Sequence, residues 1–209
     1  KVYEEIFINI INQLYKINPS ENLCVSGGCA MNSVANGKIK YNTKYNNIYI
    51  NYAPGDSGGS IGSSLFHLNN KVKFNYETLR SPYVGNLENE NIIKELLSDN
   101  KILLDKDNIK VEKFSELKML IEKIALKLTE GSVVGCFNGQ MEFGPRALGN
   151  RSILADPRNK NMKDILNYKI KRREGFRPFA PSILEEEVDN WFDIKDHVPY
   201  MSKVYNFKK

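Results

Sequence analysis

Residues 139–152 read GQMEFGPRALGNRS, and residues 171–182 read KRREGFRPFAPS. Arginines alternate with glycines and apolar residues in both stretches. Glycine lets a backbone approach a ligand closely, and a guanidinium group holds phosphate oxygens two at a time. A solvated basic loop is the alternative, but such loops do not usually carry buried-type side chains such as those found here, Phe143, Leu148, Phe176 and Phe179. We therefore expect a pocket for a polyphosphate or an acyl phosphate.

The residues around these two stretches predict mixed helices and strands. A buried strand over 133–137 leads into the first stretch, and a helix from about 162 to 170 separates the two. Apolar spacing over 115–129 indicates an amphipathic helix that stops at Gly131. Weaker patterns predict a helix over 91–97, extended chain over 111–114, a strand over 180–184 and an acidic helix start at 185–187. The fold class is α/β.

The first third of the chain repeats a strand, a glycine turn and a helix. A strand over 23–25 runs into Ser26-Gly27-Gly28 and a helix opening over 30–38, and a strand over 47–50 is followed by 54–62, PGDSGGSIG, and another helix. A helix N-terminus behind a glycine turn suits an anion. Asp56 either caps the second helix or serves a metal or substrate, and the pattern leaves both open.

Both ends of the sequence predict elements without partners. Ile6, Ile10, Leu14 and Ile17 form an apolar stripe on an expected N-terminal helix, and residues 200–207 alternate like a strand. Residues 70–90 lose this periodicity and suggest a linker. We expect a piece of a longer protein.

Composition narrows the class of protein. The net charge is +5, from 30 basic and 25 acidic residues, which fits an anionic ligand but is a mild excess for a nucleic-acid binder. The apolar runs are too short for a membrane span, and no signal peptide is visible, so a cytoplasmic protein is expected. Cys24, Cys29 and Cys136 lack a disulfide or metal spacing, which predicts small buried side chains.

The motifs at 26–32, 54–59, 139–152 and 171–182, in this order, resemble the ATP-dependent O-carbamoyltransferases of the nodulation and antibiotic-tailoring type. The resemblance implies that residues 1–75 are the end of an actin- and sugar-kinase-like carbamoyl-transfer domain. It implies that residues 76–209 are most of a domain similar to threonylcarbamoyl-adenylate synthase, truncated at its C-terminus. ATP and carbamoyl phosphate would form carbamoyl-adenylate, and the carbamoyl group would pass to a hydroxyl of a small-molecule acceptor.

The resemblance also implies roles for individual residues. The phosphate-binding pair would be Lys171 and Arg173, with Arg146, Arg151 and Arg177 as further clamps. A lysine point charge and a guanidinium fork suit the charge that develops as pyrophosphate leaves, and Mg²⁺ could accompany the ATP. Asp56 would bind a divalent metal, expected to be iron, that polarises the carbamoyl carbonyl. The nucleotide would lie on glycines and an amide, namely Gly27, Gly28, Asn32, Gly58 and Gly59.

Two departures from the family pattern matter. His67 and His197 are the only histidines and are not spaced to share a metal, so the family's two histidine ligands would come from the missing N-terminal part of the same protein. The family's Ser-x-Asn motif would follow residue 209. An RNA- or tRNA-binding module stays open as an alternative, although aromatic stacking residues are lacking, and so does a non-catalytic scaffold.

Overall fold

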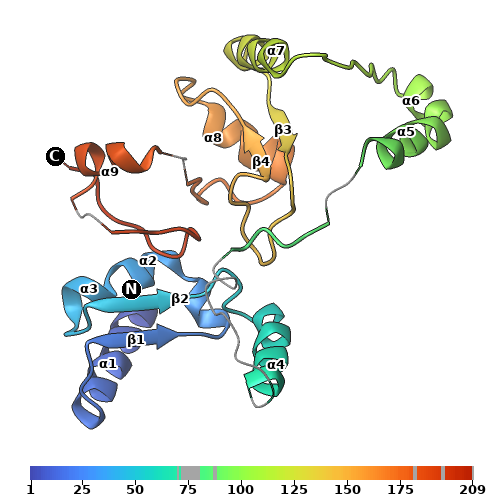
Figure 1. The fold of residues 1–209 in the computed structure, drawn as a ribbon. Coiled ribbons are helices and arrows are strands. Elements are labelled where there is room, and N and C mark those ends of the chain that lie inside the picture. The colour runs from blue at the N-terminus through green and yellow to red at the C-terminus, as the bar shows by residue number, and fades with distance from the viewer. Residues whose placement is uncertain (70, 72–80, 87–88, 181–182, 194–195, 209) are drawn as a thin grey trace. The chain divides into compact units, whose positions relative to one another are not determined.

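The computed structural model describes residues 1–69, 71, 81–86, 89–180, 183–193 and 196–208 (Figure 1). Helices and two small sheets alternate along the chain, as the α/β prediction requires. The helices are α1 Val2–Ile17, α2 Ser33–Gly37, α3 Ile39–Asn42, α4 Ser57–Asn69, α5 Glu90–Asp99, α6 Lys101–Lys106, α7 Leu117–Thr129, α8 Met162–Ile165 and α9 Val188–Trp191. The strands are β1 Asn22–Val25, β2 Asn47–Ile50, β3 Val134–Phe137 and β4 Arg151–Leu154.

The described residues form two compact units. The first comprises Lys1–Tyr83, Phe143–Leu148 and Ala180–Lys209, and the second comprises Val84–Glu142 and Gly149–Phe179. The predicted boundary between residues 75 and 76 lies outside the described residues. Residues 143–148 and the described part of 180–208, which we expected in the second domain, belong to the first compact unit.

A parallel pair of strands organises the first unit (Figure 1). Strands β1 and β2 pair in register from Asn22 opposite Asn47 to Val25 opposite Ile50, and the connection runs through a 3₁₀ turn, α2 and α3. The core on this pair contains Ile11 of α1, Leu23, Ile39 and Tyr45. Parallel strands need such a crossover, and it leaves both glycine turns at the carboxyl ends of the two strands.

Helix α1 buries a different face from the predicted one. Ile11 lies in the core with Phe7, Ile8 and Tyr15 against it. The predicted stripe is exposed, from 44% at Leu14 to 82% at Ile17. Apolar residues therefore lie on both faces of α1, and periodicity alone did not identify the one that packs on the sheet.

The C-terminal residues fold back onto α2 instead of forming the predicted strand. Among the described residues, one antiparallel bridge joins Phe192 to Phe207. The Val204 N–H donates to the Ser33 carbonyl (3.0 Å), and the buried Asn36 side chain donates to the Ala30 and Ser202 carbonyls (2.7 and 2.9 Å). Its side chains contact several parts of the first unit, since Tyr200 packs in the cluster with Tyr52 and the Tyr205 ring lies against the Tyr41 ring.

A buried polar cluster accompanies this segment. Asp196 Oδ2 accepts hydrogen bonds from Lys203 Nζ (2.9 Å) and from the Tyr205 hydroxyl. Burial opposes ionisation of Asp196, but these two donors lower the pKa of its carboxyl below the usual value. Burial first, and then the bond to Asp196, raise the pKa of Tyr205. The charged pair is satisfied, as a buried ion pair must be.

The second unit is built on an antiparallel pair. Helix α7 ends before Gly131, which has a φ of +85°, and the chain then enters β3. Strand β3 pairs with β4, with Val134 opposite Leu154 and Phe137 opposite Arg151. Helix α8 continues into a single π-helical stretch, Leu166–Lys171. Short π-helical insertions often occur at functional sites.

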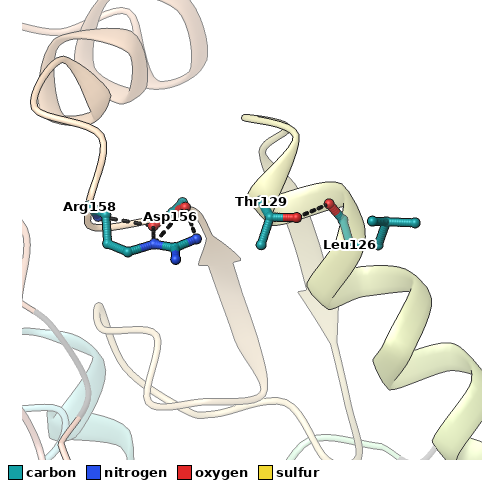
Figure 2. A network of polar contacts seen from close by, with 4 residues as sticks. All are labelled: Leu126, Thr129, Asp156 and Arg158. Atoms are coloured by element: carbon teal, nitrogen blue, oxygen red, sulfur yellow. Dashed lines mark hydrogen bonds and ion pairs between the residues drawn. The ribbon is translucent and has the colours of Figure 1, made fainter.

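A tight turn follows β4 in the second unit. Arg158 donates from Nε and Nη2 to the Asp156 carboxylate, at 2.9 and 2.6 Å, and its backbone N–H donates to Asp156 Oδ1 at 3.0 Å (Figure 2). Figure 2 also shows the Thr129 hydroxyl donating to the Leu126 carbonyl (2.7 Å) at the end of α7. Both contacts fix the points where the chain leaves regular structure.

Several further expectations need correction. The described part of 180–184, namely Ala180, Ile183 and Leu184, is not in a strand, and residues 111–114 belong to neither a helix nor a strand. Cys24 is exposed because it lies on the uncovered face of β1, Cys29 is exposed in the 3₁₀ turn Gly28–Met31, and Cys136 is partly exposed on β3. Among the described residues, no helix has the length and apolar character needed to cross a membrane.

Candidate functional site

Two glycine turns of the first unit border one hollow. The Gly27 N–H, in a residue with a φ of +92°, donates to the Pro54 carbonyl at 2.7 Å and joins the turn after β1 to the turn after β2. The hollow has a volume of about 500 Å³. Its lining includes four of the residues expected to bind nucleotide or metal, Gly27, Asp56, Gly58 and Gly59. The carboxyl ends of parallel strands are the usual place for such a site.

The other two nucleotide-site candidates of the first unit do not line the hollow. The Asn32 side chain accepts a hydrogen bond from the Ala35 N–H (3.1 Å) and caps α2. Gly28 opens the 3₁₀ turn Gly28–Met31, and a Cβ on it would meet no described atom within 4 Å. Gly58 has a packing reason of its own, since a Cβ there would lie 2.1 Å from the Ala53 carbonyl oxygen.

Asp56 lies at the edge of the hollow with an exposed side chain. The hydrogen bonds given for the described residues include none to its carboxylate. Among these residues no three His, Cys, Asp or Glu side chains gather to hold a metal ion. His67 is exposed on α4, and His197 is exposed and faces Glu185 at 3.1 Å. The described residues do not by themselves fit a metal centre.

Arg146 belongs to the first unit. Residues 143–148 pack there, with Phe143 and Leu148 against the buried cluster of Tyr52, Ala53 and Tyr200. Gly144 has a φ of +111°, and a Cβ on it would lie 2.5 Å from the Tyr52 carbonyl oxygen. Arg146 Nη2 donates to the Met31 carbonyl at 3.0 Å, next to the first glycine turn. The guanidinium is thus held by a backbone carbonyl of the first unit.

A second hollow, also of about 500 Å³, lies in the second unit. It is lined by Tyr168, Arg172, Arg173, Glu174 and Arg177. Three guanidinium groups meet one carboxylate there, and that carboxylate, on Glu174, pairs with Arg177 Nε at 2.7 Å. No carboxylate among the described residues lies within ion-pair distance of Arg173. The excess of positive charge makes this hollow suited to an anion.

Arg173 is held in place by neutral groups. Its Nε donates to Oδ1 of the fully buried Asn167 at 2.7 Å, and its Nη2 lies 3.4 Å from the Pro178 carbonyl oxygen. The guanidinium carbon lies 4.6 Å from the centre of the Phe179 ring, a cation–π distance. These contacts orient the guanidinium without neutralising its charge.

Arg151 is held by a buried carboxylate. Glu142 is 2% exposed, and its two oxygens accept from the Asn150 N–H (2.9 Å) and from Arg151 Nε (2.8 Å). The bonds tie together the two points at which the chain leaves and re-enters the second unit. Lys171 ends the π-helical stretch with an exposed side chain, and neither it nor Arg151 lines the hollow at Arg173.

The residues predicted to hold phosphate therefore fall into both units. Arg146 belongs to the first unit, and the second contains Arg151, Lys171, Arg173 and Arg177. The aromatic residues also differ from expectation, because Phe176 is 78% exposed and Phe179 is 37% exposed. Phe179 contacts the Arg173 guanidinium with its ring.

Sequence reasoning missed four residues of these sites. Glu142, Asn167, Tyr168 and Arg172 were given no role, although Glu142 and Arg172 stand inside the two arginine-bearing stretches. Arg172 has a φ of +48° and turns the chain out of the π-helical stretch. A polar residue in an apolar-spaced helix, Asn167 in LNYKI, was the one available signal for a buried hydrogen-bonding role.

Two models of one protein family match this chain. Residues 1–65 match the carbamoyltransferase N-terminus and residues 125–209 match the carbamoyltransferase C-terminus. The N-terminal match includes the hollow at the two glycine turns. The C-terminal match includes the hollow lined by Arg172, Arg173 and Arg177. The chain belongs to the carbamoyltransferase family.

Several curated proteins are similar over almost the whole chain. "Uncharacterized protein sll1178" of Synechocystis sp. is 40% identical over 205 residues, which are 96% of this chain and 32% of the relative. "Uncharacterized protein MJ1058" of Methanocaldococcus jannaschii is 36% identical over a region that is 97% of this chain and 32% of the relative. "Nodulation protein NolO" of Bradyrhizobium diazoefficiens is 34% identical, over 99% of this chain and 37% of the relative. The chain spans about a third of the length of these relatives.

Proposed function

We propose that the protein containing this chain is an ATP-dependent O-carbamoyltransferase. It would form carbamoyl-adenylate from ATP and carbamoyl phosphate and transfer the carbamoyl group to a hydroxyl of a small-molecule acceptor. The observation that carries the proposal is the hollow at Arg172, Arg173 and Arg177, which holds one paired carboxylate against three guanidinium groups. Family membership supports the transferase class.

In this proposal the second unit binds the phosphates. Lys171 and Arg173 would hold the triphosphate, and Arg151 and Arg177 would offset the negative charge that grows as pyrophosphate leaves. Mg²⁺ would accompany the ATP as its usual counter-ion. The hollow beside Gly27, Gly58 and Gly59 would receive the nucleotide part of the intermediate, with Arg146 beside it.

The test is ATP–pyrophosphate exchange that depends on carbamoyl phosphate, measured in the full-length protein. Arg173→Ala should lower exchange about ten- to a hundredfold, because one charge-assisted contact is lost. Lys118→Ala is the matched control, since Lys118 is an exposed cation of the same unit, 4.0 Å from Glu122. Exchange at the wild-type rate in Arg173→Ala would exclude the adenylation site.

Asp56 would supply one ligand of a divalent metal, with iron as our first choice and the other ligands from the part of the protein before residue 1. Asp56→Asn keeps the size of the side chain but weakens a metal ligand. We expect the full-length variant to keep its thermal midpoint and to lose bound metal and carbamoyl transfer, while exchange continues. Unchanged metal content by elemental analysis would remove Asp56 from the ligand set.

A further inference from the structure

We infer that Asn167 is the positioning residue that sets Arg173 for an oxyanion ligand. Asn167 has no exposed surface, although it lies on the exit from α8 beside a charged hollow. A buried amide is costly unless its donors and its acceptor are all used. Its partners therefore show what the residue does.

Each polar atom of the Asn167 side chain is engaged with the arginine loop. Oδ1 accepts from Arg173 Nε at 2.7 Å, and Nδ2 donates to the Arg177 carbonyl at 3.0 Å and to the Gly175 carbonyl at 3.3 Å. The Asn167 backbone carbonyl also accepts from the Arg173 N–H at 2.9 Å. One buried residue thus fixes both the side chain of Arg173 and the loop that carries Arg177.

The contacts of Arg173 leave its terminal Nη groups for a ligand. A guanidinium group has five N–H donors in one plane. Nε and one hydrogen of Nη2 face Asn167 and Pro178, while the Phe179 ring covers one flat face. The remaining Nη hydrogens are left for a ligand in the hollow, which Arg173 lines together with Arg172 and Arg177. A guanidinium fork matches two oxygens of a phosphate.

A neutral acceptor serves this purpose better than a carboxylate would. Asn167 holds Nε without neutralising the guanidinium, so the charge of Arg173 is offset only in part, by the Glu174 carboxylate that pairs with Arg177. An aspartate there would compete with the phosphate and would also place its charge against two carbonyl oxygens. An amide at this position therefore favours anion binding by Arg173 more than a carboxylate would. The inference rests on the proposed function only for the identity of the anion.

The experiment uses inorganic pyrophosphate as the probe, with binding to the full-length protein measured by calorimetry and the exchange reaction measured in parallel. Asn167→Ala should weaken pyrophosphate binding and raise the KM for ATP by about ten- to a hundredfold, with a smaller change in kcat. In an Arg173→Ala background the same substitution should add little, because Asn167 acts through Arg173. Asn36→Ala is the matched control, since Asn36 is equally buried and donates to two carbonyls but holds no arginine.

Arg173→Lys tests the same bond without touching the buried residue. Lysine keeps the charge but has no Nε–H at the position of the guanidinium donor, so its pyrophosphate affinity should fall almost as far as that of Arg173→Ala. Wild-type affinity in Arg173→Lys, or in folded Asn167→Ala, would overturn the inference while leaving the proposed function intact. If Asn167→Ala loses pyrophosphate binding and the wild-type protein shows no ATP–pyrophosphate exchange, the inference is supported and adenylation is refuted. No pyrophosphate binding by the wild type would overturn both.

Discussion

Buried polar side chains hold the arginines of the second unit. Glu142 bonds Arg151 through a carboxylate, and Asn167 bonds Arg173 through an amide. The two pairs differ in charge, since Arg151 is bonded to a carboxylate and Arg173 to a neutral amide. At the scale of single residues, the partner that orients an arginine also decides whether it offsets the charge of that arginine.

Glu142 offers a stability test at this scale. Glu142→Ala leaves the Asn150 N–H and Arg151 Nε without their acceptor, and we expect it to lower the free energy of unfolding by about 1–3 kcal/mol. Glu142→Gln keeps an acceptor of the same size and should cost less. Urea unfolding measures both. Glu130→Ala, which removes an exposed ion pair with Lys127, is the control and should cost under about 0.5 kcal/mol. Equal costs for Glu142→Ala and the control would contradict this role.

Asp156 gives a prediction about pH. Hydrogen bonds from the Arg158 side chain and N–H lower the pKa of its carboxyl from the ordinary 3.8 to about 2. Because the folded-state pKa is below the unfolded one, the stabilisation is present above pH 3.8 and is lost as the pH falls through about 2. An NMR titration of the carboxyl carbon should show a midpoint near 2, and Arg158→Ala should move it up towards 3.8. A wild-type midpoint that Arg158→Ala leaves in place would argue against the Arg158 contact as the cause.

At the scale of elements, close backbone packing explains why α2 carries a glycine. A Cβ on Gly37 would lie 1.9 Å from the Val204 carbonyl oxygen, so Gly37→Ala must displace the C-terminal segment. We expect a loss of about 1–3 kcal/mol in the free energy of unfolding, together with faster hydrogen exchange at the Val204 amide. Gly62→Ala is the control, because a Cβ there meets no described atom within 4 Å and alanine favours the helix. Equal protection of the Val204 amide in both variants would count against the close packing.

Elements with a strong local signal could be predicted from the sequence. Both glycine turns followed strands as expected, and α7 ended at Gly131. Strand β4 was missed because its first residues, Arg151 and Ser152, belong to the stretch that we interpreted as a phosphate-binding loop, and its pairing with β3 is not local. The segment 200–207 was mistaken for a strand because its apolar residues pack against separate parts of the first unit, Tyr200 on Tyr52 and Tyr205 on Tyr41. In the site, residue types that bind phosphate were visible, but Asn167 and Glu142 act through bonds that only the fold creates.

At the scale of the whole molecule, the two units differ in the segments of the chain that they contain. The second unit is made of Val84–Glu142 and Gly149–Phe179, whereas the first takes residues from both sides of it and also Phe143–Leu148. The two family matches, 1–65 and 125–209, therefore do not coincide with the two compact units. Residues matched to the C-terminal family model, such as Tyr200, complete the core around Tyr52 in the first unit.

The discontinuity of the first unit has a consequence for synthesis on the ribosome. Tyr52, Asn36 and Gly37 emerge early, but their partners Tyr200, Ser202 and Val204 emerge more than a hundred residues later. Chains are made from the N-terminus at roughly 5–20 residues per second. These apolar and polar surfaces therefore remain without their packing partners for several seconds. The second unit, by contrast, has all its residues once Phe179 has left the exit tunnel. Translation thus delivers a complete second unit before the residues that close the first.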